Sequence, residues 1–295
     1  LGNLEAVKNE ADRSVDTVAL YVREAVAAGQ LGKQKMPNDV MAAESLALLY
    51  ENSAVYASAA LPKAEELYRR AQELEPNNPL YFLKLGQVKK ITADSKPEGA
   101  ARTQLFTEAK QFFEQSIEKK ENLGATYYNL AVVLSRLKEN DAAIDRAQDA
   151  VRYDRNNMSY QYNLGVLYQL RSEEVDEDRA EAIFKDMLSA NERLIDVRFS
   201  LGLLYEKQGK RTEAIEQYEK ILSFLPEDAE GNLKLTREQV VQIIDNVKSG
   251  VGNITRRGTA SPAAPVTPPV PEVPQTPAGP APVEPNTSPL SGEGQ

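Results

Sequence analysis

The stretch Ser159–Leu170, SYQYNLGVLYQL, decides how the rest of this 295-residue chain is interpreted. A similar stretch precedes it as TYYNLAVVLSRL, and another follows it as VRFSLGLLYEKQ. Aligned on Leu130, Leu164 and Leu201, the three copies stand 34 and 37 residues apart. A near-constant period of this size indicates a repeat architecture, in which each repeat is one supersecondary unit.

A leucine followed by a small residue marks each copy, and Leu85-Gly86 is an earlier pair of the same kind. In two copies a tyrosine follows the small residue by three positions. These spacings place the residues on one face of a helix, and the small residue lets a second helix approach closely. The positions assigned to this packing face are Leu85, Gly86, Leu130, Ala131, Leu164, Gly165, Tyr168, Leu201, Gly202 and Tyr205.

A second helical pattern follows each of these stretches. In the last copy it carries Ala214, Tyr218 four positions later and Pro226 eight positions further, and the same set occurs early in the chain, ending at Pro76. Proline disfavours helix in the residue before it, so both prolines are expected to stop their helices. The intermediate copies carry Ala109 with Phe113, Ala143 with Ala147 and Ala180 with Phe184.

In this order the two patterns resemble the tetratricopeptide repeat, a helix–turn–helix of 34 residues. The resemblance implies an all-α fold: a right-handed α-solenoid of about five such helix pairs with capping helices, followed by a disordered proline-rich tail. A generic helical bundle is the alternative, and the repetition in the right order argues against it. The expected pairs span 43–76, 79–121, 124–155, 158–192 and 195–226.

Three of the expected pairs are longer than the standard repeat. The extra residues fall around 53–60, in ITADSKPEGAARTQ at 91–104, and in the acidic run SEEVDEDR at 172–179. Insertions in solenoids are tolerated in loops, so we expect loops there, with the acidic run solvated. Calcium binding is the alternative for the acidic run, which lacks the alternating ligands and central glycine of a helix–loop–helix site. Lys89 stands where the repeat has tyrosine, so the second pair is expected to pack less well.

The ends of a solenoid need protection, because a terminal repeat exposes an apolar face. Valine and alanine recur at helical spacing over 4–28, and Gly29 is expected to end that helix. Residues 1–42 are interpreted either as a capping helix or as a linker to upstream sequence. Both interpretations stay open.

The solenoid domain is expected to cover 43–248 and to end with its own capping helix. Thr236 followed by Gln239 predicts a capping box, and the helix should continue to about Val247. Residues 249–295 form a third region, in which proline recurs every third residue for much of its length. Since polyproline II has three residues per turn, this tail is interpreted as an extended spacer rather than as a docking site for a proline-binding domain.

Composition excludes several classes of function. The chain has no Cys and no His, which removes disulfides, zinc–thiolate sites and His-based triads. The net charge of −9 argues against a nucleic-acid partner. No run of 18 apolar residues is present to span a membrane, although a span preceding Leu1 is left open. We therefore expect no enzyme activity, no catalytic residues, no cofactor and no metal.

The resemblance also implies a concave groove, lined by the first helix of each pair, that binds a peptide or an extended protein segment. The residues placed there are Leu83, Lys84, Gln87, Tyr128, Asn129, Val132, Tyr162, Asn163, Val166, Phe199, Ser200 and Leu203. An asparagine amide both donates and accepts hydrogen bonds, so it suits a peptide backbone. The alternative is that the aromatic residues only seal neighbouring helices. The family's chaperone-tail clamp is not expected, because its basic positions hold Ala125, Asp196 and Ser200.

These features predict a non-enzymatic scaffold for a protein or peptide partner, of bacterial type. The alternative is the C-terminal accessory arm of a larger enzyme or envelope assembly protein, one that a membrane span could anchor. The two alternatives for its location are the cytoplasm and the bacterial cell envelope, and tethering at the envelope is favoured.

Overall fold

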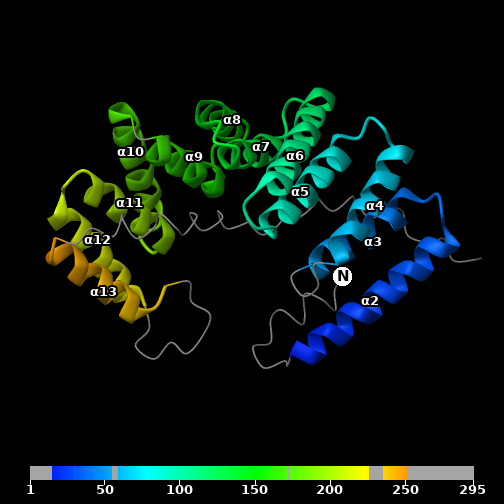
Figure 1. Ribbon diagram of the computed structural model, residues 1–295, viewed down its shortest axis with the longest axis horizontal. Helices are drawn as coiled ribbons and strands as arrows, with labels where there is room; N and C mark the ends of the chain where they lie inside the picture. The colour runs from blue at the N-terminus through cyan, green and yellow to red at the C-terminus, as the bar shows by residue number, and fades with distance from the viewer. Residues whose placement is uncertain (1–14, 55–58, 172, 226–234, 251–295) are drawn as a thin grey trace, which may run out of the picture.

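The computed structural model describes residues 15–54, 59–171, 173–225 and 235–250. Every regular element within these ranges is a helix, and the helices follow one another along an arch (Figure 1). The expected tail at 249–295 lies almost wholly outside the described residues, as do residues 1–14 of the N-terminal region. The α-solenoid implied by the repeat is confirmed.

Five helix pairs form the body of the arch, and each agrees with its expected span. One helix precedes the pairs and one follows them. The helices are α2 (Val15–Lys35), α3 (Val40–Ser53), α4 (Ala60–Leu74), α5 (Pro79–Asp94), α6 (Ala100–Lys119), α7 (Gly124–Arg136), α8 (Asn140–Tyr153), α9 (Met158–Arg171), α10 (Glu174–Ala190), α11 (Ile195–Lys207), α12 (Arg211–Phe224) and α13 (Arg237–Lys248). Each helix packs on the next one along the chain, as expected for a solenoid.

Several helices begin where a capping residue satisfies their first amides. The Asp39 side chain accepts a hydrogen bond from the Ala42 amide at 2.7 Å at the start of α3. The predicted capping box of α13 is confirmed, since Thr236 and Gln239 each bind the backbone of the other. Caps of this kind typically stabilise a helix by about 1 kcal/mol.

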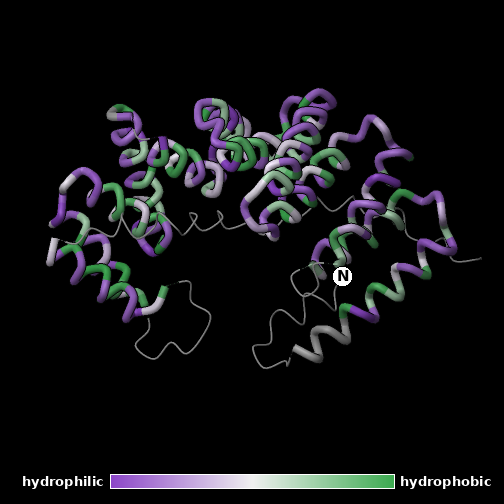
Figure 2. The backbone as a smooth tube through the Cα atoms, in the orientation of Figure 1, coloured by the Kyte–Doolittle hydropathy of each residue, from purple (hydrophilic) through white to green (hydrophobic). Residues whose placement is uncertain are grey.

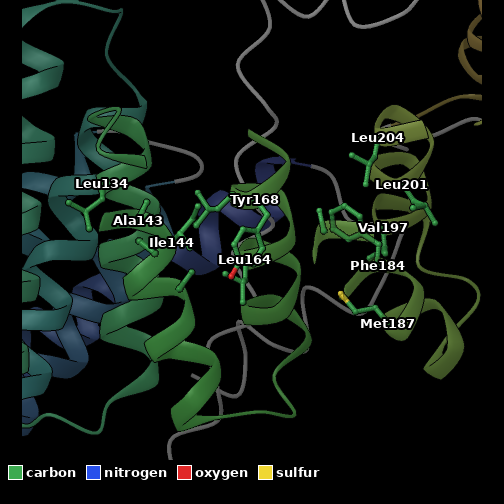
Figure 3. Close-up of a cluster of buried hydrophobic side chains, with 14 of the residues drawn as sticks. Leu134, Ala143, Ile144, Leu164, Tyr168, Phe184, Met187, Val197, Leu201 and Leu204 are labelled. Atoms are coloured by element: carbon green, nitrogen blue, oxygen red, sulfur yellow. The ribbon is translucent and has the colours of Figure 1, made fainter. Parts of the chain in front are cut away.

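Three hydrophobic clusters of buried residues fill the described part of the arch. The largest runs from α5 to α13, a second holds α3, α4 and α5 together, and a small third one lies between α7, α8 and α9. Figure 2 shows apolar and polar residues mixed along every helix, as expected for helices that bury one face. Figure 3 shows the largest cluster, with leucines of α7, α9 and α11 pointing between helices.

The glycines of the packing face lie against aromatic rings of the second helices. A Cβ atom added to Gly86 would stand 2.5 Å from the Phe113 ring, and one added to Gly165 would stand 2.6 Å from the Phe184 ring. In the third pair, Ala131 replaces the glycine and the second helix carries Ala147 instead of a ring. The two helices of a pair therefore approach closely at these glycines, and in the third pair two alanines take the place of the glycine and the ring.

The expected long loop at 91–104 is wrong. Helix α5 continues to Asp94 and α6 begins at Ala100, so only residues 95–99 connect them. Ala93 is fully buried and Ile91 packs on the core, and this packing extends α5 beyond the length of α7. The inserted residues lengthen both helices rather than form a loop.

The loop expected for the acidic run is also wrong for most of its length, because α10 begins at Glu174, whereas Glu173, Val175, Asp178 and Arg179 are exposed as expected. Asp176 is fully buried, and Arg171 of α9 donates hydrogen bonds to both of its carboxylate oxygens at 2.6 and 2.9 Å. The run therefore starts a helix and pairs with the preceding one.

Gly29 does not end the N-terminal helix. It lies inside α2, where an added Cβ would stand 2.9 Å from Leu46 of α3. The glycine is explained by close packing rather than by a turn. Within the described part of 1–42, helix α2 packs on α3.

Candidate functional site

The first helices of the pairs form a layer of their own. Helix α7 contacts both α5 and α9, and α9 contacts α11. In Figure 1 the second helices α6, α8 and α10 lie along the outer rim of the arch. We call the surface of α5, α7, α9 and α11 that carries the expected groove residues the inner face.

The expected groove residues divide into two sets by burial. Six are partly exposed: Lys84, Gln87, Tyr162, Val166, Phe199 and Leu203. Six are buried: Leu83, Tyr128, Asn129, Val132, Asn163 and Ser200. The inner face thus exposes more side-chain surface on α9 and α11 than on α7, whose three groove residues are all buried.

Two aromatic residues of the inner face, Tyr128 and Tyr162, contact the first helix of the next pair. The Tyr128 ring stacks on Tyr160 of α9 with centroids 5.2 Å apart, and burial raises the pKa of Tyr128 to about 12. The Tyr162 hydroxyl lies 3.0 Å from the Ser200 hydroxyl of α11. These contacts give both rings a packing role, and Tyr162 keeps part of its surface exposed.

The two asparagines occupy equivalent positions but differ in their hydrogen bonds. Asn129 donates from Nδ2 to the Ala125 carbonyl oxygen at 2.8 Å, one helical turn earlier. Asn163 is 5% exposed, and its Oδ1 accepts no hydrogen bond within the part of the chain that the structure describes. Asn163 therefore presents a buried acceptor without a donor.

A further inner position was missed by the sequence analysis, four residues after the small residue of each first helix. It holds Glu51, Lys90, Ser135, Gln169 and Glu206. Tyr68 donates to Glu51 at 2.6 Å, and Tyr218 donates to Glu206 at 2.5 Å. Burial, with the neighbouring Glu51 carboxylate, raises the pKa of Tyr68 far above its usual value.

This position varies together with the ring of the second helix. Where the ring is a phenylalanine, in the second and fourth pairs, the carboxylate is replaced by Lys90 or Gln169. A phenylalanine cannot donate the hydrogen bond that a buried carboxylate needs. This covariation is visible in the sequence once the repeats are aligned, so sequence analysis could have identified the position four residues after the small residue.

Comparisons with known proteins agree with this architecture. Residues 195–227 match the family model of the tetratricopeptide repeat. The chain has a tetratricopeptide repeat fold. A human relative, interferon-induced protein with tetratricopeptide repeats 2, is 26% identical over 150 residues, covering 48% of this chain and 32% of that protein. The match therefore spans about a third of that protein's length.

Solved structures share the fold at low sequence identity. The APC/C hetero-tetramer Cut9–Hcn1 matches with a TM-score of 0.56 and 16% identity, covering 78% of this chain and 40% of that one. YrrB, described as a TPR protein with an unusual peptide-binding site, matches with a TM-score of 0.51 and 20% identity, covering 69% of this chain and 95% of that one. The pilF protein of Pseudomonas aeruginosa matches with a TM-score of 0.51 and 17% identity, covering 75% of this chain and 93% of that one.

The tetratricopeptide repeat fold is a scaffold for protein–protein interaction, and such proteins are typically not enzymes. Among the residues that the structure describes, no three His, Cys, Asp or Glu side chains are grouped to hold a metal ion. Within the same ranges, no helix combines the length and the apolar character needed to cross a membrane.

Proposed function

We propose that the chain is a non-enzymatic scaffold that binds an extended segment of a protein partner along the inner face. In this proposal the solenoid at 43–248 carries the binding surface, 1–42 caps it and 249–295 is a spacer. An accessory arm of a larger polypeptide, the alternative, would use the same surface.

The observation that carries the proposal is the unpaired Oδ1 of Asn163. Leaving a buried acceptor without a donor costs about 1–3 kcal/mol. Buried polar groups are almost always paired, so the exception calls for an explanation. A backbone N–H of a partner segment would supply the donor, as the backbone of an extended peptide offers regularly spaced N–H and C=O groups.

The surroundings of Asn163 support a peptide ligand. Tyr162 precedes it and Val166 follows one turn later, and both keep part of their surface exposed. An aromatic ring beside an amide offers apolar contact area together with a polar anchor. The similar fold of YrrB, which has a peptide-binding site of its own, is compatible with this use of the scaffold.

The test selects displayed random peptides of about 12 residues, an extended length of roughly 40 Å, against the full chain. The dissociation constants of the best peptides are then measured for the parent, Asn163→Ala and the outer-helix control Asp145→Ala. We expect Asn163→Ala to weaken binding about tenfold, through loss of one hydrogen bond to a buried acceptor. Asp145→Ala, which alters an exposed residue of α8, should leave binding unchanged.

A stability measurement separates binding from folding. Asn163→Ala should not lower the free energy of unfolding, because Oδ1 has no hydrogen bond to lose and its removal relieves the cost of an unpaired buried acceptor. The matched change Asn129→Ala should lower it by about 1 kcal/mol through loss of the Ala125 contact. If no peptide is enriched, or if all three proteins bind equally, the inner face is not the binding surface.

A further inference from the structure

Lys90 is a buried cation near the C-terminal end of α5. Its side chain is only 7% exposed, although lysine is rarely buried without a partner. It occupies the inner position that holds Glu51 in the first pair and Gln169 in the fourth. Its electrostatic neighbours lie on both sides of α5, with Glu51 on α3 and Arg136 on α7. The ammonium group therefore belongs to the layer of first helices.

No described carboxylate forms an ion pair or hydrogen bond with Lys90, and the carboxylates near it are engaged by other groups. Glu51 accepts from Tyr68 at 2.6 Å and from Lys84 at 3.2 Å. Asp94, one turn after Lys90, is approached at 3.8 Å by both Arg102 and Arg136. Burial lowers the pKa of Lys90, which is the direction expected for an ammonium group without a close anion.

The charges around Lys90 are unbalanced. Lys84, Lys90, Arg102 and Arg136 surround two carboxylates, those of Glu51 and Asp94, so the cluster carries excess positive charge. The whole chain has a net charge of −9, which makes a local excess of cations around Lys90 unusual for this protein. A single anionic group from a partner would complement it.

We propose that the partner segment places an aspartate or glutamate side chain between α5 and α7, where its carboxylate pairs with Lys90. This proposal rests on the proposed function, because it uses the same inner face. Asn163 of α9 holds the partner's backbone, and Lys90 selects an acidic side chain further along the same segment.

The alternative of a nucleic-acid phosphate backbone fits the same cations less well. Nucleic-acid binding requires a stripe of basic residues that follows many phosphates. Here the excess is confined to one place, and the inner residues of α9 and α11 named above are aromatic, amide, hydroxyl, aliphatic and carboxylate groups rather than cations. One carboxylate within a peptide fits both the local excess of cations at Lys90 and the absence of cations among the named inner residues of α9 and α11.

The experiment uses the same displayed random peptides and the full chain. Selection against the parent should enrich Asp or Glu at one position of the peptide. Replacing that residue by Asn or Gln should weaken binding to the parent about tenfold or more, as expected for a charge-assisted hydrogen bond. Lys90→Met should bind both peptides with equal affinity, whereas Lys110→Met on the outer helix α6 should discriminate as the parent does.

The outcomes distinguish this inference from the proposed function. If the selected peptides bind through Asn163 but show no acidic preference, the Lys90 site is wrong and the scaffold stands. If Lys90→Met still prefers the acidic peptide, another cation makes the contact and the inference is overturned. If no peptide is selected, both fail. The comparison of acidic and amide peptides on the parent protein needs no variant to fold.

Discussion

The second helix pair, α5–α6, and the fourth, α9–α10, are built alike at the contact between glycine and ring and differ about one turn later in the first helix. Both place a glycine against a phenylalanine ring, with almost the same approach at Gly86 and Gly165. The residues three and four positions after the glycine are Lys89 and Lys90 in one pair and Tyr168 and Gln169 in the other. The small-residue and ring positions therefore specify the fold, and their neighbours are free to change chemistry.

The largest effect should come from filling the glycine contacts. Gly86→Leu and Gly165→Leu should each lower the free energy of unfolding by about 3 kcal/mol, because the added side chain forces two helices apart. Gly32→Leu is the control, since apart from its chain neighbours and the backbone of its own helix no described atom lies within 4 Å of a Cβ placed there. Chemical denaturation followed by circular dichroism measures all three. A large loss at only one of the two packing glycines would break the comparison between the pairs.

An intermediate effect should come from the ion pair that joins the two helices of each pair. Asp176 in the fourth pair is fully buried against Arg171 at 2.6 Å, whereas Asp94 in the second is approached by Arg102 only at 3.8 Å. Asp176→Asn should cost about 2–3 kcal/mol, as expected for hydrogen bonds to a charged group. Asp94→Asn should cost less than about 0.5 kcal/mol.

The same ion pair predicts a dependence on pH. The hydrogen bonds from Arg171 lower the pKa of Asp176 below its usual 3.8. The carboxylate therefore stabilises the fold above about pH 4, and this contribution is lost as the pH falls through the lowered pKa. Acid unfolding should be less steep in Asp176→Asn than in the parent, and equal pH profiles would contradict the assignment.

Smaller effects than that of Asp176→Asn should sharpen the contrast between Lys89 and Tyr168. Lys89 reaches Glu65 at 3.0 Å and Glu108 at 2.9 Å, and although burial acts to lower its pKa, these hydrogen bonds raise it overall. Lys89→Met should cost about 1 kcal/mol at low salt and less at high salt, because salt screens ion pairs.

The matched change at the equivalent position is Tyr168→Phe. Tyr168 accepts a hydrogen bond from Gln148 at 2.7 Å, and its loss should cost about 1 kcal/mol at any salt concentration. Denaturation at two ionic strengths compares the variants. The same salt dependence for both would show that the two positions do not differ in the way we describe.

Much of the fold could be predicted because its packing rules are local. Leu164, Gly165 and Tyr168 lie within five residues of one another, and their helical spacing is readable without knowing what they contact. The capping box at Thr236 is local in the same sense. Repetition then extended this local pattern into five helix pairs, since each repeat contacts its neighbours.

Only the tertiary structure decided the features that depend on distant partners. Gly29 looks like a helix stop until Leu46 is placed against it, and the acidic run looks like a loop until Arg171 binds Asp176. The sequence shows that Asn129 and Asn163 are equivalent, but not that one amide is paired and the other is left with a bare oxygen. Hydrogen bonds and burial depend on atoms that folding brings together from distant parts of the chain. The spacing of residues along the chain does not determine which of these atoms meet.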